Sequence, residues 1–377
     1  MSRRPDRRNP LLTLGDLGQS PWLDFTTRDL IRSKRLHRMA EEDGVRGLTT
    51  NPTIFEKSIA SGSIYDADII ALAEAGFAVD EILERLMVAE VQEACDVFAA
   101  LYESSMGQHG FVSLEVSPLL AHDAASTVRH ARHLWEAVGR RNLMVKIPGT
   151  RAGLAAVEQC LTLGIHVNVT LLFSVQRYRE VSDAYLGALG ARRVSGLPLD
   201  WLGSVASFFV SRVDTLVDAK LDAIGTPEAK ALRGKAAIAN AALAYEAYLA
   251  MLAGPVWASY AAAGARAQRP LWASTSVKDP ARDPLEYCEA LIAPETVNTL
   301  PPETLEAYRE KGDPKVRLDA RAIAAAHRTV AALEGLGISL EEVAAELEQE
   351  GVRKFVESWK SLRTVLERKA SVLATRA

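Results

Sequence analysis

Eight short runs rich in β-branched and aromatic residues alternate with long helical stretches along the middle of the chain. This alternation is typical of repeated βα units, in which each strand is followed by a helix that returns the chain to the same edge of a parallel sheet. Eight such units are the number that closes a barrel. The predicted strands cover residues 22–26, 45–51, 111–117, 143–148, 166–172, 204–211, 269–275 and 295–300.

The pattern predicts an α/β fold, a (β/α)8 TIM barrel with additional helices. We interpret residues 1–377 as one domain, because no linker or low-complexity run interrupts the chain. Residues 1–18 are expected to form an N-terminal tail. Residues 303–377 contain further helical patterns and are expected to pack on the barrel as C-terminal helices.

The charge balance argues against a general nucleic-acid binder. Lys+Arg 44 against Asp+Glu 48 leaves a net charge of −4, whereas such proteins carry a strongly basic domain. The three cysteines, Cys95, Cys160 and Cys288, are too far apart for a metal knuckle or a redox pair. We therefore expect a reduced, cytoplasmic protein.

Residues 241–265 form a segment that is nearly free of charge over a length that could span a bilayer. The segment is dominated by alanine, contains Glu246, and is interrupted by Gly254 and Pro255. We interpret it as a packed crossover helix and expect no membrane partner. No metal-ligand motif or glycine-rich nucleotide loop follows any strand, so no metal and no cofactor are expected.

One face of the predicted strands is consistently polar. Successive side chains of a strand point to opposite faces, and the other face is apolar, with residues such as Phe25, Leu171 and Phe208. Active sites of such barrels lie at the carboxyl ends of the strands, where the polar residues gather. The predicted inward set is Trp22, Asp24, Thr26, Thr49, Asn51, Ser113, Glu115, Ser117, Met144, Lys146, His166, Asn168, Thr170, Ser207, Phe209, Ser211, Trp272, Ser274 and Ser276.

Lys146 stands in the apolar run LMVKIP and would meet Glu115 from the preceding strand. Desolvation in general favours the neutral amine, which attacks carbonyl groups to form a Schiff base. Asp24 and Glu115 would then divide the proton transfers of dehydration and carbon–carbon cleavage. A buried ion pair of Lys146 with Glu115 is the structural alternative.

Uncharged amides and two cations complete the polar set. Asn51 and Asn168 suit the hydroxyls of a sugar, although buried amides also serve as structural partners. Arg212 and Lys278 follow the sixth and seventh strands near Ser274, which suits a phosphate. Solvated charges are the alternative for these two cations.

The chain resembles the transaldolase family, in the longer bacterial type found in actinobacteria and within the class I Schiff-base aldolases. The motifs that carry the resemblance occur in order over nearly the whole chain: SPWLDF (20–25), GLTTNPTIF (47–55), SLEVSP (113–118), NLMVKIPGT (142–150), GIHVNVTLLFS (164–174), SFFVSRVD (207–214), RPLWASTSVKDP (269–280) and ETVNTLPPET (295–304).

The resemblance implies an enzyme of the pentose phosphate pathway that needs no cofactor. Such an enzyme transfers a dihydroxyacetone unit between sedoheptulose 7-phosphate or fructose 6-phosphate and glyceraldehyde 3-phosphate or erythrose 4-phosphate. Lys146 matches the Schiff-base lysine, and Asp24 matches the group that takes the C4 hydroxyl proton. Glu115 with Thr170 matches the pair that moves protons through a water during imine formation.

The resemblance also assigns the residues that bind the substrate. Asn51 and Asn168 match the amides that hold the dihydroxyacetone portion, and Arg212 matches a phosphate-binding arginine. Ser207 and Phe209 match residues that line the site, and Thr49 shares their face. Shorter relatives have a Ser-x-Arg pair on the seventh strand, where this chain has Ser274 and, further on, Lys278 as the substitute cation.

Two alternatives remain at this point. The first is a lyase similar to fructose-6-phosphate aldolase, although those relatives are shorter and tend to have tyrosine in place of Phe209. The second is a non-catalytic barrel that binds sugar phosphates. We expect sugar-phosphate substrates and a monomer or homodimer.

Overall fold

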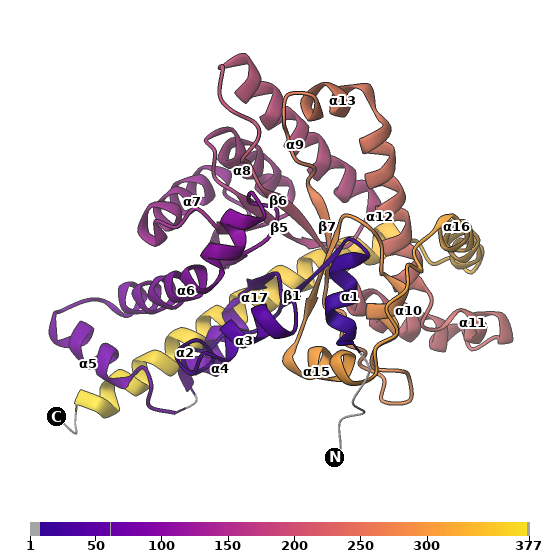
Figure 1. The fold of residues 1–377 in the computed structure, drawn as a ribbon. Coiled ribbons are helices and arrows are strands. Elements are labelled where there is room, and N and C mark those ends of the chain that lie inside the picture. The colour runs from indigo at the N-terminus through magenta and orange to yellow at the C-terminus, as the bar shows by residue number, and fades with distance from the viewer. Residues whose placement is uncertain (1–7, 61, 375–377) are drawn as a thin grey trace.

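The computed structural model, which describes residues 8–60 and 62–374, contains a closed barrel of eight parallel strands in chain order (Figure 1). This confirms the predicted barrel. All eight strands lie within three residues of the predicted bounds: β1 (Gln19–Leu23), β2 (Gly47–Thr49), β3 (Phe111–Glu115), β4 (Leu143–Pro148), β5 (Val167–Leu172), β6 (Ser204–Phe209), β7 (Arg269–Ala273) and β8 (Thr296–Leu300).

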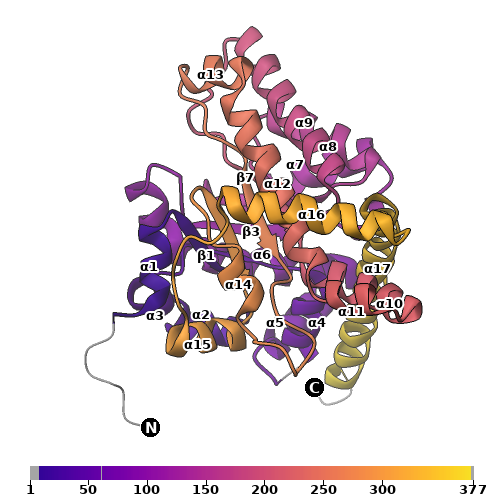
Figure 2. The ribbon, with the colours of Figure 1, turned by 90° about the vertical axis from the view of Figure 1, so that its right-hand side faces the viewer.

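Helices connect the strands and form the outer layer of the barrel (Figures 1 and 2). The connection between β2 and β3 holds three of them. In chain order the connecting helices are α2 (Arg28–Arg32), α3 (Arg35–Glu42), α4 (Pro52–Ala60), α5 (Asp66–Glu74), α6 (Val79–Ser104), α7 (Ala124–Val138), α8 (Arg151–Thr162), α9 (Val175–Val194), α10 (Ser211–Ile224), α11 (Pro227–Leu232), α12 (Ala236–Ala253), α13 (Pro255–Ala261) and α14 (Glu286–Ala290), with a short 3₁₀ turn at Pro118–Leu120.

The expectation of a tail over residues 1–18 is wrong for its second half. Helix α1 (Pro10–Asp16) precedes the barrel, and its residues Leu11 and Leu14 are buried. Asn9 starts this helix, because its side-chain oxygen accepts a hydrogen bond from the Leu11 N–H at 3.0 Å. Residues 1–7 lie outside the described residues.

Helix α12 is the apolar segment that raised the question of a membrane span. It ends before Gly254, and Pro255 begins α13, as the sequence predicted. Among the described residues it is the one helix long and apolar enough to cross a bilayer, and 56% of that stretch is buried. The helix packs against α9, α10 and α16 (Ala320–Gly335), which Figure 2 shows lying across it. This confirms a packed crossover helix between β6 and β7.

The last helix covers the carboxyl end of the barrel. After α15 (Pro302–Lys311) and α16, the long helix α17 (Leu340–Ala374) crosses the molecule as the yellow helix of Figure 1. It packs against α4, α5, α6, α10 and the end of β5. Its apolar residues therefore meet the elements that carry the predicted site.

Candidate active site

A cavity of about 440 Å³ opens at the carboxyl end of the barrel, and we call it the main cavity. Ten of the twelve candidate residues line it, although they come from seven different segments of the chain. The remaining two, Glu115 and Asn168, are buried directly beside it on β3 and β5. The ten are Asp24, Thr49, Asn51, Lys146, Thr170, Ser207, Phe209, Arg212, Ser274 and Lys278.

Lys146 and Glu115 form a buried pair at the edge of the main cavity. The two residues are register partners on β4 and β3, and their side chains are 5% and 3% exposed. Lys146 Nζ lies 3.5 Å from Glu115 Oε2 and donates a hydrogen bond to the Thr50 carbonyl at 3.2 Å. Neither carboxylate oxygen has a hydrogen-bond partner among the described residues. The pair can therefore still exchange protons with a molecule bound at the amine.

Burial shifts the protonation of both acidic candidates in the same direction. It raises the pKa of Glu115 to about 7, with a smaller contribution from Asp24, and Lys146 opposes the shift. Burial also raises the pKa of Asp24, against the attraction of Lys146 and Lys278. A carboxyl with a pKa near neutrality can both donate and accept a proton at physiological pH, which is the property of a general acid–base group.

The two candidate amides occupy different positions. Asn51 lines the main cavity, while its Oδ1 accepts a hydrogen bond from the Ile54 N–H at 3.0 Å in the first turn of α4. Asn168 is fully buried, with Oδ1 accepting from Ser207 Oγ at 2.7 Å and Nδ2 donating to Ser113 Oγ at 3.0 Å. Direct contact of Asn168 with a sugar therefore stays a prediction, and it requires a sugar hydroxyl to replace one of these two serine hydrogen bonds.

Unlike Asn168, Thr170 has a side chain that makes no hydrogen bond with the described residues. Its Oγ1 is buried, lines the main cavity, and has no hydrogen-bond partner among the described residues. A buried hydroxyl without a partner costs free energy, so it is suited to meet a polar group of a bound molecule. The side-chain oxygens of Thr170 and Glu115 are both without hydrogen-bond partners among the described residues, so both can bind a water or a substrate group, as the predicted proton-relay pair requires.

Cations and hydroxyls gather at the mouth of the main cavity. Arg212 lies in the first turn of α10, with its guanidinium 5.2 Å from the centre of the Phe209 ring. Ser274 Oγ lies 2.9 Å from Ser211 Oγ, and Lys278 Nζ donates to Ser276 Oγ at 2.7 Å. The guanidinium, the ammonium and the hydroxyls together suit a phosphate group.

The predicted inward face is wrong at two strands. On β7, Leu271 and Ala273 line the main cavity, whereas Trp272 points outward and packs against Phe208 with ring centroids 6.4 Å apart. Ser274 still reaches the cavity because its φ of 57° breaks the strand alternation one residue later. On β5, Leu171 has a φ of 60° at a register shift, so it does not follow the outer face of the strand.

Alternation also misplaced one residue beside the end of β1 and one at the amino end of β5. Phe25 lines the main cavity beside Asp24, because β1 ends at Leu23 and the pattern no longer applies. His166, predicted to share the polar face of β5, lies at the amino end of that strand and does not line the main cavity. It packs against Trp201 and Phe111, with ring centroids 5.0 and 5.3 Å apart.

Sequence reasoning missed Phe355 as a site residue. This residue of α17 lines the main cavity and places its ring centre 5.9 Å from Lys146 Nζ. The sequence predicted only that residues 303–377 form helices packed on the barrel. Lys57 of α4 and Glu303 at the start of α15 also line the main cavity and were not predicted.

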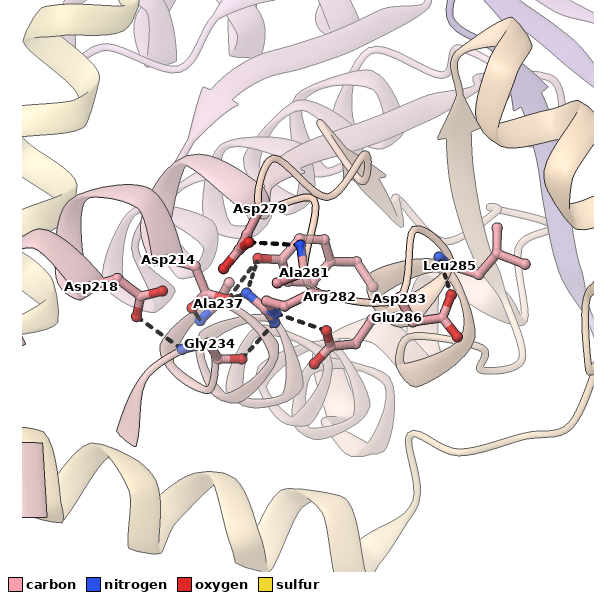
Figure 3. Close-up of polar contacts among 11 residues, drawn as sticks. Asp214, Asp218, Gly234, Ala237, Asp279, Ala281, Arg282, Asp283, Leu285 and Glu286 are labelled. Carbon is pink, nitrogen blue, oxygen red and sulfur yellow. Dashed lines mark hydrogen bonds and ion pairs between the residues drawn. The ribbon is translucent and has the colours of Figure 1, made fainter. Parts of the chain in front are cut away.

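The loop that carries Lys278 is anchored behind the site by Arg282 (Figure 3). The guanidinium donates to Asp214 Oδ2 at 3.2 Å, to the Gly234 carbonyl at 2.9 Å and to Glu286 Oε2 at 2.8 Å. Asp214 lies on α10 and is 2% exposed. The network therefore joins the loop after β7 to the helix that begins with the phosphate candidates.

We expect Arg282→Leu to lower the free energy of unfolding by about 3 kcal/mol, because it leaves the buried Asp214 carboxylate without its cation. Urea denaturation measures this loss. Arg317→Leu is the matched control, since Arg317 pairs with Glu289 and Asp313 while 38% exposed and should cost under about 1 kcal/mol. Equal losses in the two variants would contradict the assigned role of Arg282.

Comparison with known proteins agrees with this geometry. A family model described as Transaldolase/Fructose-6-phosphate aldolase matches residues 21–366. The chain belongs to this family. A protein named Transaldolase 1 from Streptomyces coelicolor is 50% identical over 93% of this chain and 92% of its own length.

Two further relatives give the same result. Proteins named Transaldolase from Frankia alni and Thiobacillus denitrificans are each 48% identical over 94% and 92% of this chain, and over 95% and 96% of their own lengths. These relatives carry the name transaldolase and not aldolase. The comparisons therefore support an enzyme with transaldolase activity and sugar-phosphate substrates, as the motifs implied.

Proposed function

We propose that the chain transfers a dihydroxyacetone unit from sedoheptulose 7-phosphate or fructose 6-phosphate to glyceraldehyde 3-phosphate or erythrose 4-phosphate, as a step of the pentose phosphate pathway. The observation that carries this proposal is the buried Lys146 amine, 3.5 Å from Glu115 and open to the main cavity. An amine beside a proton donor is the arrangement that a Schiff base requires.

The proposed sequence begins at the ketose carbonyl. The Lys146 amine attacks C2 to give a carbinolamine, and a proton supplied by Glu115 through Thr170 lets the hydroxyl leave as water. Asp24 then takes the proton of the C4 hydroxyl, the C3–C4 bond breaks, and its electrons form an enamine on the lysine. The aldose phosphate leaves, a second aldose binds, and the reverse steps return the amine and the new ketose.

The walls of the main cavity favour transfer over release of dihydroxyacetone. Phe209 and Phe355 both line the cavity, with the Phe355 ring centre 5.9 Å from Lys146 Nζ, and Phe173 packs on Phe209 with ring centroids 5.2 Å apart. Phenyl rings carry no hydroxyl that could hold a water or protonate the enamine. Exclusion of water would preserve the enamine until an acceptor arrives.

The deciding experiment measures glyceraldehyde 3-phosphate released from fructose 6-phosphate, with and without erythrose 4-phosphate. We expect release only when the acceptor is present. Release that does not need the acceptor would identify a lyase instead. If the chain binds fructose 6-phosphate but releases no glyceraldehyde 3-phosphate under either condition, the result would point to the non-catalytic barrel.

The pH dependence of imine formation tests the role of Glu115. Its carboxyl ordinarily titrates near 4.5, and its raised pKa of about 7 keeps it protonated in mildly acidic solution. We expect the rate of imine formation to show a limb that falls as pH rises through about 7, and we expect Glu115→Gln to lack that limb. Borohydride trapping at several pH values measures both profiles. The same limb in Glu115→Gln would assign the ionisation to another group.

We further propose a cytoplasmic location and a monomeric or homodimeric state. The three cysteines are free thiols and are all buried, as in proteins of a reducing compartment. Sedimentation of the purified chain would distinguish a monomer from a homodimer.

A further inference from the structure

A second cavity of about 360 Å³ lies at the opposite, amino end of the barrel, and we call it the basal cavity. On β1, Ser20 lines the basal cavity, whereas Asp24, just past the strand, lines the main cavity. Trp22 lies between them, fully buried, with its ring 6.5 Å from that of Phe111. Packed aromatic rings therefore separate the two cavities.

The basal cavity is lined by three arginines although the chain as a whole carries a net charge of −4. Arg46 precedes β2, Arg266 lies in the loop before β7, and Arg269 begins β7. Glu295, just before β8, is the one carboxylate among the described residues that line it. One carboxylate cannot neutralise three guanidiniums, so the lining of the basal cavity carries an excess of positive charge.

Two of these guanidiniums have unused donors. Arg46 makes no side-chain hydrogen bond or ion pair with any described residue, and Arg266 Nη1 is buried without a partner. Arg269 is held in place instead, donating to Ser20 Oγ and to the Gln108 carbonyl, both at 2.9 Å. The cost of a buried guanidinium N–H without an acceptor applies to Arg266, whereas Arg46 is only half-buried.

His109 adds a neutral donor to the same wall. Ser20 Oγ accepts from Arg269 and lies 3.2 Å from His109 Nδ1, so its own proton is free to point at that nitrogen. Burial, with Arg269 and Arg46 nearby, lowers the pKa of His109 to about 4, and the ring is neutral at pH 7. When Ser20 donates its proton to Nδ1, the ring proton resides on Nε2, which is then a hydrogen-bond donor.

The backbone beside the arginines leaves room for the Arg266 guanidinium. Gly107 has a φ of 77°, and a Cβ at this position would lie 2.6 Å from Arg266 Nη1. A volume of about 360 Å³ is within the usual range for small-molecule sites. Guanidiniums from two parts of the chain, before β2 and at the start of β7, line this cavity and suit the oxygens of a phosphate group.

We propose that the basal cavity is a second anion-binding site, which takes a small phosphorylated ligand through Arg46, Arg266 and Arg269. The site is separate from the main cavity and does not depend on the reaction there. Inorganic phosphate and a phosphate ester share the chemistry that it recognises.

Calorimetric titration in phosphate-free buffer tests the proposal with two probes, inorganic phosphate and glycerol 3-phosphate, which has no carbonyl to react with Lys146. We expect two sites in the unmodified chain. Arg212→Gln should weaken the site in the main cavity, and Arg46→Gln with Arg266→Gln should weaken the other about tenfold or more. The probe that binds the basal cavity with the lower Kd shows whether the free ion or an ester is the preferred ligand.

The matched control is Arg179→Gln with Arg328→Gln, which removes the same charge from exposed positions. It should retain both sites. Arg46→Gln and Arg266→Gln should also leave transfer kinetics in phosphate-free buffer within about twofold, which shows that the chain still folds. A single site that disappears in Arg212→Gln, or unchanged binding in the Arg46 and Arg266 double variant, would overturn the proposal.

Discussion

Lys146→Met is expected to lower kcat for transfer by about 10⁴-fold or more, because no other amine would form the Schiff base. The assay follows glyceraldehyde 3-phosphate release from fructose 6-phosphate in the presence of erythrose 4-phosphate. Borohydride reduction and mass spectrometry should detect an adduct on Lys146 in the unmodified chain and none in the variant.

The variant should still fold. Lys146 lies among apolar residues of β4 and under Phe355, where a methionine side chain can pack. Lys146 is also the group that lowers the pKa of Glu115. Without the lysine that pKa rises above about 7, so the carboxyl takes up a proton and remains buried in its neutral form.

Lys57→Met is the matched control, because Lys57 is an exposed lysine that also lines the main cavity. Its loss should weaken binding of the phosphorylated substrate, seen as a raised KM, while the adduct on Lys146 still forms. Persistence of transfer in Lys146→Met, or loss of the adduct in Lys57→Met, would contradict the assignment of the nucleophile.

The barrel and the centre of the site could be predicted from local patterns. Each strand is a short run between helical stretches, so counting the runs was enough to predict eight strands and their order. Lys146 and Glu115 lie within regular strands, where alternation fixes the face of every side chain. Their register as neighbours on β3 and β4 follows directly.

Alternation could not predict the positions where the backbone departs from a regular strand. Leu171 and Ser274 both have left-handed φ values, of 60° and 57°. Neither residue is a glycine, which would have marked such a conformation in the sequence. The error at Trp272 has the same origin, because Ser274 reaches the main cavity only after the alternation has been broken.

Long-range packing was the other source of error. Phe355 reaches Lys146 from a helix more than two hundred positions later in the chain, and helical spacing shows only that this helix has an apolar face. Residues 1–18 were expected to form a tail, although Leu11 and Leu14 bury one face of α1. The position of Phe355 has no signature in the neighbouring sequence, whereas α1 has one, the capping residue Asn9 followed by Pro10.

Asp24→Asn is expected to separate imine formation from carbon–carbon cleavage. Removal of the base that takes the C4 hydroxyl proton should lower release of glyceraldehyde 3-phosphate by about 10²- to 10⁴-fold. The Lys146 amine and Glu115 are unchanged, so borohydride should still trap fructose 6-phosphate on the lysine. Quantifying the adduct and the released aldose in the same samples measures both steps.

The pH dependence of the unmodified chain should agree with this role. Asp24 acts as a base and must be ionised, and burial raises its pKa, so cleavage should slow as pH falls through that raised pKa. Glu303→Gln is the matched control, because Glu303 is a second carboxylate that lines the main cavity and is exposed. Its loss removes a negative charge that raises the pKa of Asp24, and so should move the acidic limb to lower pH without blocking cleavage. Loss of the trapped adduct in Asp24→Asn would instead place Asp24 in imine formation, since a residue needed only for cleavage acts after the imine exists.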